Sequence, residues 1–249
     1  MARISYDERT AAAFKEAREI PREALAGWRE AVRRHLRPSP GMTLVDVGAG
    51  TGTFAAAFAD WFDIRVVAVE PSTAMRHRIP RTPAIEVLDG DACAVPLPDR
   101  SADGAWLSLV IHHIADLAAA AREIRRVLRP GAPVLMRGGM SGTSLDGIEI
   151  VRWFPETARV VDTFPSLDET CDAFAAAGFQ RVALERVRET YPTGLADLLG
   201  QVGTLRVADT TMRGLTDDEF RRGTARLRRA VETGSAELRS NTLDLLVLR

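Results

Sequence analysis

The chain has 249 residues, of which 46% are hydrophobic and 27% are charged, and its formal net charge is −1. These values are typical of a globular protein and argue against the strongly positive field that nucleic-acid-binding domains usually carry. The two cysteines, Cys93 and Cys171, have no Cys-x-x-Cys spacing, which favours a reducing compartment and argues against structural zinc. A charged N-terminus and the lack of an apolar run of ~18 residues predict a cytoplasmic protein without a membrane span.

The first half of the chain alternates between predicted helices and predicted strands. Residues 21–37 begin with a proline at a helix-start position and place Leu25 and Trp28 on one apolar face. Runs of apolar residues then predict strands over residues 43–47, 64–70, 84–91, 102–110 and 132–138. Helical patterns separate these runs, the clearest of them over residues 116–128. Such alternation indicates βαβ crossovers and a parallel sheet with helices on both faces.

The second half of the chain is less regular. Residues 139–165 hold several glycines and a short predicted helix, and the helix that follows begins with a capping box made by Ser166 and Glu169. Strands are predicted over residues 181–189 and 244–249. An arginine-rich helix is predicted over residues 216–232, and its arginines are interpreted as a solvent-facing side. No repeat or linker is evident, so a single domain with two insertions is predicted.

A glycine-rich turn, VDVGAGTG over residues 45–52, directly follows the first predicted strand. Glycines there let a ligand approach the backbone N–H groups and the N-terminus of the next helix. In the dinucleotide fingerprint G-x-G-x-x-G the sixth position is glycine, whereas here it is Thr53 and the third glycine comes one place early. Glu70 ends the next strand, where an acid can accept hydrogen bonds from ribose hydroxyls. The turn and Glu70 thus indicate adenosine binding but do not distinguish a nicotinamide dinucleotide from S-adenosylmethionine.

Further segments resemble one family. The chain is similar to class I S-adenosylmethionine-dependent methyltransferases in VDVGAGTG, VVAVEPSTAM, GDACAVPLPDRSADGAWLSLVIHHIAD and REIRRVLRPGAPVLMRG, which together cover about residues 43–138. FKEAREIP and RWFPETARVVDTFPSLDETCDAF also resemble bacterial small-molecule members of the family. The late N-x-F-G-I-R-N signature of the menaquinone-synthesising subfamily is absent from the sequence.

The resemblance implies an α/β fold, namely a Rossmann-like, doubly wound, seven-stranded and mostly parallel sheet whose last strand is antiparallel. A helical N-terminal lid and the insertions would cap the active site. Within a single methyltransferase domain, residues 1–249, it implies a lid at 1–40, a cofactor-binding core at 41–138, and substrate-cap insertions at 139–165 and 191–235.

The resemblance also implies a site for S-adenosylmethionine, with S-adenosylhomocysteine as the product. Glu70 would hold the ribose, Pro71 and Asp91 with Ala92 would contact the adenine, and Arg18 could pair with the methionine carboxylate. The remaining predicted cofactor contacts are Asp46, Gly48, Ala49, Gly50, Thr51, Gly52, Ser108 and Leu109.

Residues for the acceptor are suggested by position. His112 and His113 follow the fourth predicted strand, at the edge where open α/β sheets bind ligands, and an imidazole there could take a proton from the acceptor. Because they are adjacent and have no evident third ligand, no metal site is predicted. Trp153 and Tyr191 lie in the insertions and either line an acceptor pocket or pack the cap.

The predicted function is methyl transfer to a small-molecule acceptor that is held in line with the donor. No nucleic-acid partner or membrane is expected, and the oligomeric state stays open. Three alternatives are a nicotinamide-dependent oxidoreductase, a methyltransferase acting on RNA or another macromolecule, and a cofactor-binding regulatory protein of the same fold.

Overall fold

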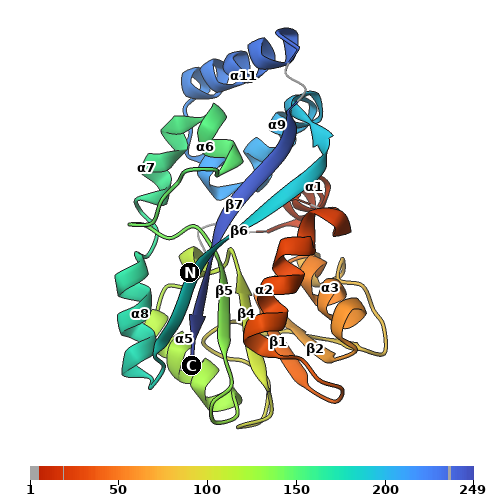
Figure 1. Ribbon diagram of the computed structural model, residues 1–249, viewed down its shortest axis with the longest axis vertical. Coiled ribbons are helices and arrows are strands. Elements are labelled where there is room, and N and C mark those ends of the chain that lie inside the picture. The colour runs from red at the N-terminus through yellow and green to blue at the C-terminus, as the bar shows by residue number, and fades with distance from the viewer. Residues whose placement is uncertain (1–5, 19, 235–236) are drawn as a thin grey trace.

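The computed structural model describes residues 6–18, 20–234 and 237–249, without the side chain of Arg18. In this part of the chain seven strands form one sheet in the order β3-β2-β1-β4-β5-β7-β6 (Figure 1). The strands are β1 (Thr43–Val47), β2 (Arg65–Val69), β3 (Ile85–Leu88), β4 (Gly104–Ser108), β5 (Val134–Gly138), β6 (Arg181–Gly194) and β7 (Leu238–Leu248). The first five pair in parallel, and β7 lies antiparallel to both β5 and β6. This order confirms the predicted fold class.

Helices cover both faces of the sheet (Figure 1). Those of the first two thirds are α1 (Glu8–Arg18), η1 (Arg22–Leu25), α2 (Ala26–Leu36), α3 (Thr53–Phe62), α4 (Thr73–Arg76), η2 (Ile111–His113), α5 (Leu117–Val127), α6 (Glu149–Trp153), η3 (Pro155–Thr157), α7 (Ala158–Val161) and α8 (Leu167–Ala176). The last third holds α9 (Leu195–Ala208), α10 (Thr210–Arg213) and α11 (Asp217–Glu232).

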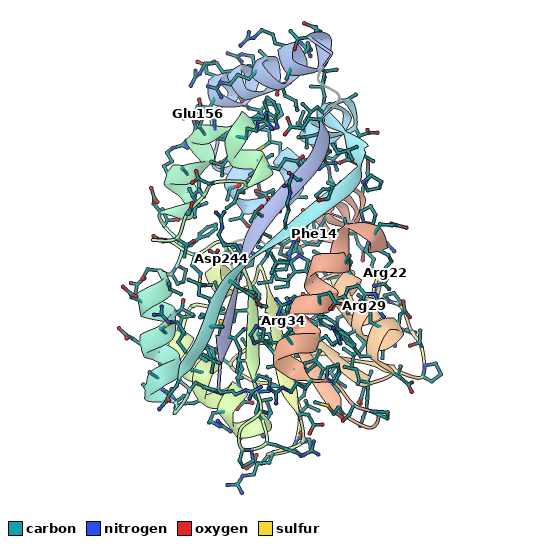
Figure 2. All side chains as sticks on the ribbon, in the orientation of Figure 1. Phe14, Arg22, Arg29, Arg34, Glu156 and Asp244 are labelled. Atoms are coloured by element: carbon teal, nitrogen blue, oxygen red, sulfur yellow. The ribbon has the colours of Figure 1, made fainter. Side chains whose placement is uncertain are left out.

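The two faces of the sheet bury separate apolar cores, because side chains alternate along each strand. On one face Trp28 of α2 and Phe54 of α3 pack against Trp106 of β4, with ring centroids 5.9 and 4.8 Å from that of Trp106. On the other face Ile124 of α5 and Phe174 of α8 are fully buried against the sheet. Arg22, Arg29 and Arg34 lie along the outer side of η1 and α2 (Figure 2).

A two-stranded ribbon carries the sheet into the cap. β7 pairs with β5 only through residues 244–248, so its first six residues pair with β6 alone. Glu189 lies opposite Asn241 in that part of the ribbon. Figure 1 shows β6 and β7 rising together beyond the ends of the other strands, toward α6, α9 and α11.

The cap has an apolar core of its own. Trp153 and Phe154 pack there with residues of α9 and with Leu227 of α11. A Cβ atom on Gly223 would lie 2.1 Å from the Phe154 ring, so α11 approaches that ring as closely as glycine permits. The side of α11 that carries Leu227 therefore packs into the cap. Of its arginines, Arg226 pairs with Glu156, which lies at the upper left in Figure 2.

Several element boundaries differ from the sequence-based expectation. β6 continues to Gly194 and β7 begins at Leu238, so both strands are longer than residues 181–189 and 244–249. Of the segment predicted as a lid, α2 packs on the sheet. Within residues 20–40 and the described residues before them, only those before Arg22 line a large cavity at the carboxyl ends of the parallel strands. Among the described residues, no helix combines the length and apolar character that crossing a membrane requires.

Candidate functional site

A cavity of about 810 Å³ lies between the carboxyl ends of the parallel strands, α1 and the cap. This volume is near the upper end of the range for small-molecule sites. Phe14 of α1 borders it from the lid side, and in Figure 2 this residue lies near the middle of the molecule. Residues predicted for the cofactor border it on the sheet side, namely Asp46, Gly48, Ala49, Gly50, Thr51, Glu70 and Pro71. Gly52 lies in the same turn but is turned away, against Ile79.

The glycine turn is held by hydrogen bonds to the second strand. The N–H groups of Gly48 and Ala49 donate to the carbonyl of Val69 at 2.8 and 3.1 Å. Gly50 has φ +58°, a left-handed conformation that favours glycine. Its N–H donates to Glu70 Oε2 at 2.9 Å, and a Cβ atom added there would meet only the Phe14 ring, at 3.7 Å. The turn therefore presents open backbone to the cavity.

Glu70 joins the turn to the start of α4. Its Oε1 accepts from the N–H of Ser72 at 2.9 Å while Oε2 accepts from Gly50. Burial raises the pKa of Glu70 even though these two N–H groups favour the carboxylate. Its position after β2, as the sequence predicted, puts a buried carboxylate at the edge of the cavity.

Asp46 lies beneath the turn and is only 1% exposed. Burial, and secondly the nearby Glu70 carboxylate, raises the pKa of Asp46 to about 8. Its Oδ2 atom has no hydrogen-bond partner in the described part of the chain. A buried polar atom at a cavity wall that lacks a partner is a position where a ligand can donate a hydrogen bond.

The end of β4 lies beside the turn. Ser108 and Leu109 line the cavity, and Leu109 has φ +53°, which is strained for a residue other than glycine. Ser108 Oγ accepts from Arg137 Nη1 at 3.1 Å. Asp91 and Ala92, which were predicted to contact adenine, follow β3 but are not among the residues that line the cavity, so this contact stays a prediction. The side chain of Arg18, the last residue of α1, lies outside the described part of the chain.

Both histidines of η2 line the cavity. The His112 ring stacks on Phe164 with centroids 4.2 Å apart, and its Nε2 atom lies 3.4 Å from Thr210 Oγ1. His113 Nε2 lies 3.5 Å from Tyr6 Oη, just ahead of α1. The pair therefore contacts the cap on one side and the lid on the other. The described residues contain no group of three or more His, Cys, Asp or Glu side chains that could hold a metal ion.

Sequence reasoning missed a set of buried charges on the cap side of the cavity. Glu189 of β6 pairs with Arg137 of β5, and its carboxylate also accepts from Trp28 Nε1 at 2.7 Å and from Tyr191 Oη at 2.8 Å. A second pair joins Arg239 of β7 to Glu149 at 2.9 Å. Tyr191, predicted as an acceptor contact, lines the cavity, whereas Trp153 lies in the core of the cap.

A signal for these residues exists in the sequence. Glu189, Tyr191 and Thr193 alternate along β6 and all point to one face of the ribbon. In β7, Arg239 and Asn241 precede Leu243 at the same spacing of two residues, so they lie on one face of the strand. The strand predicted over residues 181–189 ends at Glu189, and the strand predicted over residues 244–249 begins after Asn241, so the period-two pattern was not extended to the other four positions.

Comparison with known proteins matches residues 45–136 to the methyltransferase domain family. Ubiquinone/menaquinone biosynthesis C-methyltransferase UbiE of Caulobacter vibrioides is 36% identical over 121 residues, which are 43% of this chain and 48% of that protein. An O-methyltransferase of Pyrenophora dematioidea is 37% identical over 111 residues, which are 41% of this chain and 40% of that protein. The chain thus spans less than half the length of these relatives.

One solved structure is similar over most of the chain. It is a putative methyltransferase from an antibiotic biosynthesis pathway of Anabaena variabilis, with 21% identity and a TM-score of 0.71. The likeness covers 89% of this chain and 96% of that one. At this level of identity the likeness establishes the shared fold.

Proposed function

We propose that this chain, a member of the class I S-adenosylmethionine-dependent methyltransferases by its sequence and fold, transfers a methyl group from S-adenosylmethionine to a small molecule. One observation carries the proposal. The glycine turn with Glu70 opens into the same cavity as His112, His113 and the cap residues. A donor on the turn and an acceptor under the cap would therefore share one enclosed space, as group transfer requires.

The residues of the turn fit the donor. Gly50 offers open backbone where a side chain would enter the cavity, and Glu70 offers a carboxylate for ribose hydroxyls. The unpartnered Oδ2 atom of Asp46 adds a buried polar position beside them. These three features are the ones that a polar, adenosine-bearing ligand would satisfy.

The chain's own contribution is to position and enclose the acceptor. S-adenosylmethionine, when bound, supplies an electrophilic methyl group on a sulfonium. Phe14 from the lid and Phe164 from the cap line the cavity, where their rings would help to exclude water around the acceptor. Where the acceptor must lose a proton, the imidazole of His113 beside Tyr6 or of His112 beside Thr210 would take it.

Calorimetry tests the donor. S-adenosylhomocysteine is titrated into the wild-type protein, into Glu70→Ala and into the control Glu86→Gln, whose ion pair with Arg65 is on the surface. We expect the wild type and the control to bind alike and Glu70→Ala to bind about tenfold or more weakly, since hydrogen bonds to a carboxylate are lost. Tighter binding of NADH than of S-adenosylhomocysteine would contradict the proposal and favour an oxidoreductase.

The acceptor class is tested separately. One of the similar proteins is a C-methyltransferase of ubiquinone and menaquinone biosynthesis, and this likeness supports a small molecule as the acceptor. Incubation with radiolabelled S-adenosylmethionine and cell extract should then place label in the low-molecular-mass fraction. Label that appears in total RNA or in protein instead would move the proposal to a macromolecular acceptor.

A further inference from the structure

We infer that Glu149, Arg239 and Gln201 form the subsite that recognises the acceptor. These side chains fit an uncharged group of the substrate that carries a hydrogen-bond donor next to a hydrogen-bond acceptor. A carboxamide is the simplest such group. This inference rests on the proposed methyl transfer and specifies the substrate class of the same cavity. It follows from the contrast between two buried arginine–glutamate pairs.

The subsite is assembled from α6, α9 and β7. Arg239 Nη2 donates to Glu149 Oε2 at 2.9 Å, and Nη1 donates to Gln201 Oε1 at 3.1 Å. The guanidinium also lies 4.8 Å from the centre of the Tyr191 ring. All three polar side chains line the large cavity. Glu149 and Arg239 also border a second hollow of about 310 Å³, so this pair, together with Ile148 and Val151, lies between the two spaces.

The neighbouring pair is saturated. The Glu189 carboxylate accepts from side chains of Trp28, Arg137, Tyr191 and Asn241. Glu189 is fully buried, and the Arg137 charge with these donors outweighs burial and lowers its pKa. Such a carboxylate has used its hydrogen-bonding capacity on the protein itself.

Glu149 differs from Glu189. Among the described contacts, the side-chain hydrogen bonds to its carboxylate come from Arg239 alone. Burial raises the pKa of Glu149 in spite of that pairing. A carboxylate has about four lone-pair sites, so Glu149 retains room to accept from a ligand.

The partner cation has matching spare capacity. A guanidinium has five N–H groups, and those of Arg239 that donate here are Nε–H and one on each Nη atom. Glu149 and Arg239 lie 2.9 Å apart and both line the cavity, so one ligand group can reach both side chains. A ligand carboxamide can donate its N–H to Glu149 and accept at its oxygen from Arg239. A ligand with a net charge would be attracted by one member of the pair and repelled by the other, so little would offset the cost of removing its charge from water.

The test uses three probes with the same ring and different head groups: benzamide, benzoate and benzylammonium. The ring suits the apolar cavity wall that includes Ile150, Phe164 and Leu205. Dissociation constants are measured by calorimetry or ligand-observed NMR on protein saturated with S-adenosylhomocysteine. We expect benzamide to bind the wild type most tightly.

The variants shift the charge in opposite directions. Glu149→Gln should weaken the binding of benzamide about tenfold, because a hydrogen bond to a charged group is lost. The same variant should strengthen the binding of benzoate, because Arg239 is left without its counter-charge. Arg239→Gln should strengthen benzylammonium. Glu185→Gln is the matched control, since that residue of β6 pairs with Arg34 away from the cavity, and it should change each constant by less than about twofold.

Thermal unfolding checks that each variant folds. If a single variant does not fold, the double variant Glu149→Leu with Arg239→Leu removes both charges and their hydrogen-bonding groups together, a change that buried ion pairs often tolerate, and it should abolish the preference for benzamide. The inference is overturned if benzamide does not bind the wild type most tightly, or if its affinity is unchanged in the folded variants. Binding of S-adenosylhomocysteine is a separate readout. If the wild type does not bind it, the proposed function is contradicted. If the wild type binds it but the three probes do not show the expected order of affinities, only the subsite is contradicted.

Discussion

The two sides of the cavity are built in different ways. On the sheet side, the wall includes the glycine turn and the residues that follow β2, in two stretches over residues 46–54 and 70–75. On the cap side, polar side chains far apart in sequence meet, as Arg137 meets Glu189 and Glu149 meets Arg239. The sheet side has one partly neutralised acid pair, Asp46 with Glu70, and the cap side has ion pairs.

This difference suggests a division of labour. A wall built on a glycine turn suits a ligand whose shape does not vary, because its geometry is set by the turn between β1 and α3. A wall of side chains on a ribbon can change its chemistry by substitution without disturbing the sheet. The predictions below test whether the two sides respond to mutation and to pH as this division requires.

The largest effect is expected on the cap side, from Glu189→Ala. The change leaves the Arg137 charge buried without its partner and removes the acceptor of Trp28 and Tyr191. We expect the free energy of unfolding to fall by about 3–5 kcal/mol, as measured by urea denaturation. Glu185 lies on the same strand as Glu189 and forms a partly exposed pair with Arg34 of α2. Glu185→Ala should lower the free energy of unfolding by about 1 kcal/mol or less. Equal losses in the two variants would show that Glu189 is not the centre of this network.

A second effect concerns pH and distinguishes the two sides. The pKa of Asp46 is about 8 in the folded protein, whereas its ordinary value is 3.8. At a pH between these two values, Asp46 is therefore protonated in the folded state and ionised in the unfolded state. The free energy of unfolding should then fall as pH rises through that window. Between pH 5 and pH 7 the wild type should lose ~2–3 kcal/mol more than Asp46→Asn.

Glu189 responds in the opposite sense. Its pKa is lowered in the folded protein, so its contribution is present above its unfolded pKa and is lost as pH falls through the acid range. Urea denaturation of the wild type and Asp46→Asn at several pH values separates the two contributions. Parallel pH dependences in the two proteins would mean that Asp46 is ionised in the folded state.

The same division explains how much the sequence could reveal. The turn and Glu70 were predictable because a glycine pattern and the acid that ends the next strand are both visible in a window of ~25 residues. The arginine–glutamate pairs were not, because their contacts depend on the register of β6 against β7, in which Glu189 lies opposite Asn241. No local pattern encodes that register. Its only trace is the alternation of residues along the two strands.

The smallest effect tests whether backbone alone shapes the sheet side. Gly48 and Gly50 both have positive φ, at +72° and +58°, so alanine at either position is strained by about 1–2 kcal/mol. A Cβ atom at Gly48 would also lie 2.5 Å from Val110 Cγ2, whereas at Gly50 the nearest atom is 3.7 Å away. Gly48→Ala should therefore lower the free energy of unfolding more than Gly50→Ala does, by about 1 kcal/mol.

Binding should separate these two alanine variants differently from stability. The added methyl group of Gly50→Ala enters the cavity where the turn faces Phe14, so this variant should lose affinity for S-adenosylhomocysteine although it is the more stable of the two. Urea denaturation and calorimetry on both proteins provide the measurement. If affinity instead followed stability, the turn would act only as a scaffold, and the ligand would be held by side chains on both sides of the cavity.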